Sequence, residues 1–167
     1  MQRIISVLAI LVLFSTALYA QSKCFELDQK YGFRDVRFEM PINAFNGLVA
    51  PIEEGKDVKI YIRPNDKLSV GNAQLNKIVY QFYKGKLHIV ALYCDERNAG
   101  ALLYSLEQAY GSGEKSIPGI SSWYGQRVRM DYFSFNQENG YAWVCISSIK
   151  IDDKIRADEK QKARDDF

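Results

Sequence analysis

His88 is the only histidine in the 167-residue chain, so every chemistry that needs an imidazole depends on it. A serine hydrolase pairs a histidine base with a nucleophile on a strained turn, and no G-x-S-x-G motif occurs. Zinc sites need three or four closely spaced ligands, and the chain has no C-x-x-C or H-x-x-x-H pattern. We therefore predict no metal, no cofactor and no catalytic residue, and we expect His88 to be a surface or hydrogen-bonded residue opposite Gln81.

The segment GSGEKS, at Gly111–Ser116, comes near a phosphate-binding loop. The pattern G-x-x-x-x-G-K-[ST] needs glycine at positions 109 and 114, where this chain has Ala109 and Glu114. The segment also follows a predicted helix, whereas a phosphate-binding loop follows a strand. We interpret it as a helix end followed by a polar loop.

Carboxylates could provide the general acid and base of a glycosidase. Only Glu39 has a setting that could raise its pKa, and the other acids are interpreted as solvated loop residues. A small hydrolase therefore stays open as an alternative function. The acids considered are Glu39, Glu53, Glu54, Asp57, Asp66 and Asp95.

The chain holds 11 Tyr, 9 Phe and 2 Trp, which is the strongest positive signal for a binding surface. A core of this size does not easily bury them all, because Tyr and Trp need partners for their polar atoms. Four late aromatics, Phe133, Phe135, Tyr141 and Trp143, could share one sheet face; the alternative is a second small core. Tyr and Trp are common interface anchors. The candidate binding surface is Tyr83, His88, Phe133, Phe135 and Trp143.

Three cysteines, Cys24, Cys94 and Cys145, allow at most one intramolecular disulfide among three possible pairings. Cys94 and Cys145 are a possible pair. Both also lie in strand-like segments, so buried free thiols are an equally good interpretation.

Residues 1–20 read as a signal peptide: Arg3, then the apolar run Ile4–Phe14, then small residues ending at Ala20. We therefore expect an exported protein, periplasmic or secreted, without membrane insertion after signal removal. The formal net charge is +2, and Arg3 is the only charged residue of the leader. This near-neutral balance argues against nucleic acid as a partner, and leaves a protein or another envelope component.

Residues 21–150 are predicted to form one α+β domain. The first elements are a strand at 33–39, a short helix at 42–48 that follows Pro41, and a strand at 58–62 whose apolar residues alternate with a period of two. A hairpin then turns at Lys84-Gly85, because glycine supplies the positive φ of such turns. This turn would place Phe82 opposite Leu87, Tyr80 opposite Ile89 and Ile78 opposite Ala91. The apolar face of the hairpin is then covered by a helix.

That helix is capped by Asp95, runs to Tyr110 and ends at Gly111. Its apolar stripe is Ala99, Leu102, Leu103, Leu106 and Tyr110. Two more strands follow, with Met130 opposite Ile146 and Tyr132 opposite Val144. The predicted order is β-α-β-β-β-α-β-β: an antiparallel sheet of about five strands with one long helix on one face.

Residues 151–167 are predicted to form a charged, solvated helix or tail. Asp152–Arg156 and Asp158–Lys162 have the spacing of helical ion pairs, and Ile151 and Ile155 are the only apolar anchors.

Several short motifs of this chain resemble motifs of small secreted proteins of uncharacterised function from Bacteroidetes-type bacteria. They are Ile78, Tyr80, Phe82, Gly85, Lys86 and Leu87 in the hairpin, Leu106, Tyr110 and Gly111 at the helix end, and Trp123, Gly125 and Val128 beyond it. The resemblance covers about residues 33–148. It implies export and an α+β fold, and it carries no catalytic residues.

The function predicted from the sequence is that of a non-enzymatic binding domain that uses an aromatic sheet face. The alternatives are a small extracytoplasmic hydrolase and an inhibitor of a foreign enzyme, for which Gly111–Ser122 would be the projecting loop. A pocket that joins His88 to an acid and a hydroxyl would favour the hydrolase.

Overall fold

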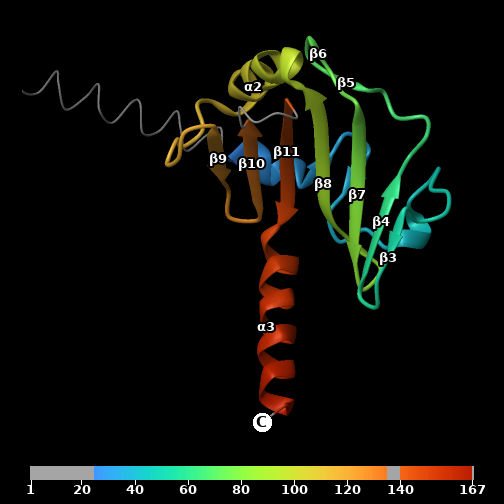
Figure 1. The fold of residues 1–167 in the computed structure, drawn as a ribbon. Helices are drawn as coiled ribbons and strands as arrows, with labels where there is room; N and C mark the ends of the chain where they lie inside the picture. The colour runs from blue at the N-terminus through green and yellow to red at the C-terminus, as the bar shows by residue number, and fades with distance from the viewer. Residues whose placement is uncertain (1–24, 135–139, 167) are drawn as a thin grey trace, which may run out of the picture.

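The structure is a computed structural model that describes residues 25–134 and 140–166. Its centre is a seven-stranded antiparallel sheet in the order β3-β4-β7-β8-β11-β10-β9 (Figure 1). The predicted α+β class is confirmed, but the sheet is wider than the five strands expected. The strands are β3 (Glu53–Glu54), β4 (Val58–Ile62), β7 (Lys77–Tyr83), β8 (Lys86–Asp95), β9 (Ile120–Tyr124), β10 (Val128–Ser134) and β11 (Tyr141–Ser148).

The N-terminal part of the domain differs most from the prediction. Instead of one strand at 33–39, β1 (Gly32–Phe33) and β2 (Val36–Arg37) form a tight hairpin, and Arg34 has a φ of 54° in its turn. The predicted helix at 42–48 is reduced to one 3-10 turn, η1 (Ile42–Ala44). A second small hairpin, β5 (Ser69–Val70) with β6 (Ala73–Gln74), follows β4.

The β7–β8 hairpin turns at Lys84 and Gly85 as predicted, and both residues have positive φ values of 46° and 75°. Phe82 pairs with Leu87, but the register then shifts, so that Gln81 pairs with Ile89. His88 is the additional residue of this β-bulge. The predicted pairs beyond Phe82 are therefore wrong by one position: Tyr80 pairs with Val90, and Ile78 pairs with Leu92.

Helix α2 (Glu96–Tyr110) covers one face of the sheet, as the apolar stripe predicts. Ala99, Leu102 and Leu106 are buried in the same core as the inward-facing strand residues. Asp95 is the N-cap residue and Gly111, with a φ of 75°, ends the helix. Both predicted helix ends are thus confirmed.

The β10–β11 register is the one predicted, with Met130 opposite Ile146 and Tyr132 opposite Val144. β9 was missed, because Ile120–Tyr124 has two serines after its first residue and lacks a clear apolar alternation. It adds Trp123 to the core beside Met130.

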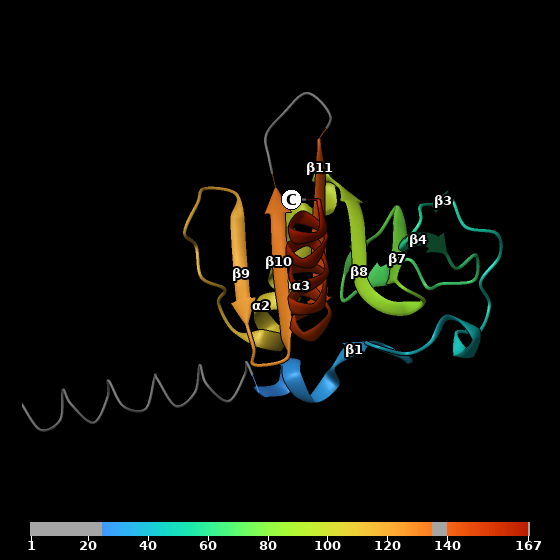
Figure 2. The ribbon, with the colours of Figure 1, turned by 90° about the horizontal axis from the view of Figure 1, so that it is seen from below.

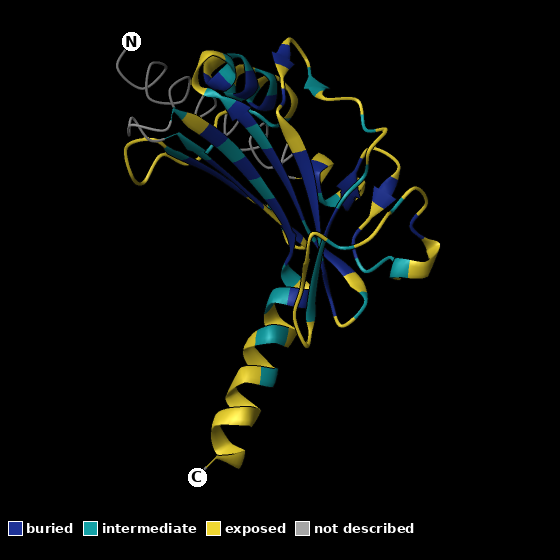
Figure 3. Ribbon diagram, turned by 45° about the vertical axis from the view of Figure 1, so that its right-hand side comes forward, coloured by how far each residue is buried: buried dark blue, intermediate teal, exposed yellow. Residues whose placement is uncertain are grey.

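Helix α3 (Ile149–Asp165) follows β11 without a loop and continues away from the sheet (Figures 1 and 2). Beyond the end of β11, residues 39–42 take its place beside β8: the Glu39 amide donates to the Leu87 carbonyl, and the Leu87 amide donates to the Met40 carbonyl. Ser148 caps the helix by accepting a hydrogen bond from the amide of Ile151. Residues 25–134 and 140–166 thus contain two long helices, α2 and α3, and the second one is exposed over its distal half (Figure 3).

Candidate functional site: the reverse face of the sheet

We call the face of the sheet opposite α2 the reverse face. Along every central strand, its residues alternate with those that point into the core. Many of its residues are half-buried, and α2 packs on the other side of the sheet. Apolar side chains occupy its centre and polar side chains lie toward β9 and β10. Its residues include Ile60, Ile62, Lys77, Val79, Gln81, Ile89, Ala91, Tyr93, Ser122, Arg129, Asp131, Phe133, Tyr141, Trp143, Cys145 and Ser147.

A row of aromatic side chains crosses three adjacent strands on the reverse face. Tyr93 of β8 pairs with Trp143 of β11, which pairs with Phe133 of β10. The rings of Phe133 and Trp143 are stacked, with centroids 5.0 Å apart and planes inclined by 19°. The ammonium of Lys77 lies 4.6 Å from the ring centre of Tyr93. The aromatic row therefore combines two stacked rings with a lysine cation at the Tyr93 end.

The structure brings together some of the residues in the predicted binding surface and separates others. Phe133 and Trp143 lie side by side on the reverse face, and Tyr141 shares that face, as expected from their spacing. Phe135 lies outside the described residues. Tyr83 is 8 % exposed, and its hydroxyl donates to Asp158 of α3 at 2.8 Å. Tyr83 is therefore covered by α3 and is not exposed to a binding partner.

Of the two settings expected for His88, on the surface or hydrogen-bonded, the structure shows the second. The histidine does not lie on the surface. It is only 3 % exposed, because the bulge turns its side chain toward the start of α3. Its Nε2 lies 2.5 Å from Oδ1 of Asp152, while Nδ1 is buried without a hydrogen-bond partner in the described structure. The contact with Asp152 places a proton on Nε2, since a carboxylate oxygen can only accept a hydrogen bond.

Asp152 lies in the first turn of α3 and contacts two strands of the sheet, β8 through His88 and β11 through Ser147. Its second oxygen, Oδ2, accepts a hydrogen bond of 3.0 Å from the Ser147 hydroxyl. Burial alone would raise the pKa of Asp152, but hydrogen bonds from His88 and Ser147 outweigh it and hold the pKa below its usual value. Asp152 was missed as a site residue, because its spacing to Arg156 suggested a solvated ion pair; Arg156 instead contacts Asp153.

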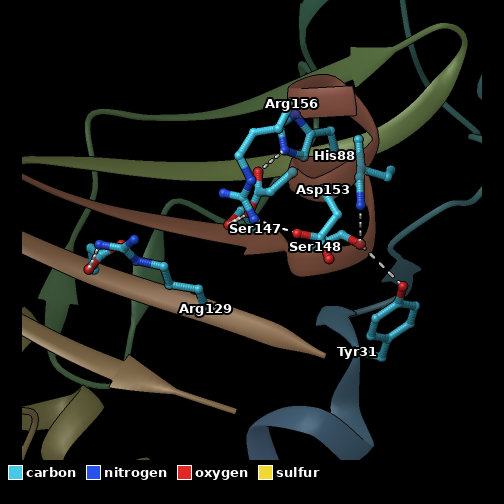
Figure 4. A network of polar contacts seen from close by, with 10 residues as sticks. Tyr31, His88, Arg129, Ser147, Ser148, Asp153 and Arg156 are labelled. Carbon is cyan, nitrogen blue, oxygen red and sulfur yellow. Dashed lines mark hydrogen bonds and ion pairs between the residues drawn. The ribbon is translucent and has the colours of Figure 1, made fainter. Parts of the chain in front are cut away.

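The cluster lines a depression of about 420 Å³ between the reverse face and α3. It contains a histidine, an acid and a serine, yet their order differs from a nucleophilic triad. The carboxylate of Asp152 lies between the imidazole and the hydroxyl, so the serine proton is directed to Asp152 and not to a histidine base. Figure 4 shows Ser147 and His88 on the same side of the α3 N-terminus. The geometry suits a structural clamp better than acyl transfer.

Cys94 and Cys145 are free thiols on opposite faces of the sheet. Cys94 lies in the core opposite Ala142, whereas Cys145 is on the reverse face opposite Ala91. Side chains that point away from each other cannot form a disulfide, so this possible pair is excluded. Burial raises the pKa of Cys145 to about 11, with smaller contributions from Asp131 and Asp152. Cys24 lies outside the described residues.

The carboxylates considered for catalysis are not paired with each other. Glu39 accepts hydrogen bonds from Tyr31 and Lys150. Burial would raise the pKa of Glu39, but these bonds hold it below its usual value, so the expected raised pKa is wrong. Asp66 is a buried acid rather than a solvated one: it accepts from the Tyr80 hydroxyl at 2.6 Å and from Nε of Arg63 at 2.7 Å. Both carboxylates therefore serve as hydrogen-bond acceptors that connect separate parts of the fold.

The projecting loop expected of an inhibitor is tied to the sheet in part. Glu114 and Ser122 exchange two backbone hydrogen bonds, which attach the loop to the outer edge of β9. Gly113 packs against the ring of Trp123, where an added Cβ would lie 3.0 Å from its atoms. Residues 115–119 remain as the exposed part.

No family model, curated protein or solved structure matches this chain. The resemblance to secreted bacterial proteins therefore stays a prediction. No helix among residues 25–134 and 140–166 is long and apolar enough to span a membrane. In the same residues, no three His, Cys, Asp or Glu side chains are grouped so that they could hold a metal ion.

Proposed function

We propose that this protein is an exported, non-enzymatic binding domain that recognises a protein, or another envelope component, through its reverse face. The observation that carries the proposal is the half-buried apolar surface of that face, formed by Ile89 and by the aromatic row Tyr93, Trp143 and Phe133. Of the two long described helices, α2 packs on the opposite side and α3 contacts mainly β11. Contiguous apolar surface rimmed by polar residues is typical of interaction sites.

The composition of the surface favours a protein partner. Aromatic side chains with few rotatable bonds are frequent anchors of protein interfaces, and the row Tyr93–Trp143–Phe133 provides them on rigid strands. Ile60 and Ile62 extend the apolar area onto β4, while Arg129 and Asp131 form a paired polar margin. This arrangement has the apolar centre and polar rim of a protein interface.

A capture experiment tests the proposal. Residues 21–167 would be used to isolate a partner from envelope extract, and its affinity would then be measured with the purified partner. Tyr93→Ala and Trp143→Ala should each weaken binding by tenfold or more, as expected for central interface aromatics. Tyr104→Ala is the matched control, because Tyr104 is 61 % exposed on α2. Equal affinity of both reverse-face variants and the control would contradict the proposal.

The His88–Asp152–Ser147 cluster supports a second candidate, a small hydrolase, because it joins an imidazole, an acid and a hydroxyl beside a depression. This candidate requires His88 to become accessible, whereas it is 3 % exposed. Ester and amide substrates would be tested with the wild type and with Ser147→Ala. Turnover lost in the variant would favour the hydrolase over the binding domain.

A further inference from the structure

A second cleft lies on the α2 side of the sheet, away from the reverse face. It has a volume of about 530 Å³ and opens between the first half of α2 and the chain that leads into β9. This volume is within the range of small-molecule sites. Its lining comes from α2, from residues 115–120 and from the inner faces of β9 and β10. We propose that this cleft binds a small amphipathic molecule, an apolar chain or ring that carries one acidic group.

The first observation that supports ligand binding in this cleft is the glycine at position 100. It lies inside α2, where glycine destabilises a helix by about 1 kcal/mol relative to alanine. Glycines in helices often permit close packing, but a Cβ at Gly100 would meet no atom within 4 Å. Its φ also lies outside the left-handed range, so the backbone does not require glycine. The missing side chain therefore serves neither packing nor backbone geometry, and it leaves the helix backbone open to the cleft.

The walls of the cleft are mostly apolar, and a hydrogen bond between β10 and α2 holds its floor in place. Leu103 of α2 and Ile117 of the loop both line it, and Ile117 is 55 % exposed. The floor includes Tyr132, which is buried and donates its hydroxyl to the carbonyl of Ala99 at 3.1 Å. This hydrogen bond ties α2 to β10. The cleft is therefore largely preformed, which favours a small apolar ligand.

The positive charge of Lys115 indicates that the ligand carries an acidic group. Among the described residues that line the cleft, Lys115 is the only charged one. Its side chain is 61 % exposed, and its Nζ lies 3.3 Å from Glu107. An exposed pair of this kind contributes little to stability, so Lys115 can exchange it for an acidic ligand at little loss. Apolar walls and one cation at the rim fit a carboxylate-bearing amphiphile, such as a medium-chain fatty acid.

The test titrates residues 21–167 with decanoate and, separately, with decanol, and follows backbone amide shifts by NMR. Shifts should concentrate at residues 99–103, 115–121 and 132–134. Decanoate should bind at least tenfold more tightly than decanol, and Lys115→Gln should remove this difference. Shifts spread over the whole surface, or equal affinity for the two probes, would overturn the proposal.

Gly100 provides a matched pair of variants. Gly100→Leu should weaken decanoate binding by tenfold or more, because its side chain enters the cleft. Gly100→Ala should raise the midpoint of thermal unfolding by about 3 °C and leave decanoate affinity within about threefold. Unchanged binding in a folded Gly100→Leu variant would overturn the site. Trp143→Ala separates this site from the reverse face, since it should leave decanoate affinity unaltered.

Discussion

Nε2 of His88 lies 2.5 Å from Oδ1 of Asp152, and this contact connects a β-bulge in β8 to the first turn of α3. A second contact lies further along the helix, where Asp158 accepts hydrogen bonds from Tyr83 and Lys84 at the β7–β8 turn. In the described chain α3 buries only Ile151. A helix with so small an apolar face is marginal alone, so we expect these polar contacts to stabilise its position at the end of the sheet.

Asp152→Ala should loosen α3 and lower the free energy of unfolding by about 2 to 3 kcal/mol. The change removes two hydrogen bonds and leaves the buried His88 ring without a partner on either nitrogen. Amide hydrogen exchange along residues 149–160 should accelerate. Asp153→Ala is the control: its carboxylate is exposed and contacts only Arg156 in the described structure, so stability should change by about 0.5 kcal/mol or less. Similar effects of the two substitutions would contradict the clamp.

Acid should release α3 before the core unfolds. The pKa values of Asp152 and Glu39 are lowered in the fold, and hydrogen bonds from Lys84 and Tyr83 lower that of Asp158 to about 2. Acids with lowered folded-state pKa values stabilise the fold above their unfolded pKa of about 4, and this stabilisation is lost as the pH falls toward the folded values. Exchange of α3 amides, corrected for intrinsic rates, should therefore rise between pH 4 and pH 2. Protection that is constant over this interval would exclude the mechanism.

The sequence predicted the elements whose signals are local. The α2 stripe, its glycine end, the Lys84-Gly85 turn and the Met130–Ile146 register all follow from spacing within one or two elements. The bulge at His88 has no such signal. Residues 39–42, from a distant part of the chain, bond to Leu87 beside the bulge, and no local pattern reveals this contact.

The candidate site shows the same limit. The shared face of Phe133 and Trp143 was predictable, because alternation along two neighbouring strands determines it. Asp152 and Asp158 look like members of helical ion pairs, and only the direction in which α3 leaves β11 turns them toward the sheet. That direction is a tertiary property, so no spacing rule reveals their role.

The two described cysteines should behave as separate, unreactive thiols in the folded protein. Cys94 is fully buried, and burial raises the pKa of Cys145 to about 11, so little thiolate forms at neutral pH. In a Cys24→Ser variant, a thiol reagent at pH 7 should label less than about a tenth of either site within minutes. Denaturation without a reductant should expose both thiols at once. A mass two hydrogens lower before denaturation would reveal a disulfide and contradict the opposite-face assignment.

The two faces of the sheet should differ sharply in their contribution to stability. Phe82 is fully buried and contacts Phe45 and Tyr61 with edge-to-face rings, so Phe82→Ala should lower the free energy of unfolding by about 3 to 5 kcal/mol. Tyr93 is half-buried on the reverse face, and Tyr93→Ala should cost about 1 kcal/mol. Chemical denaturation of both variants measures the difference. A loss at Tyr93 as large as that at Phe82 would identify the reverse face as a second core, and would remove it as a binding surface.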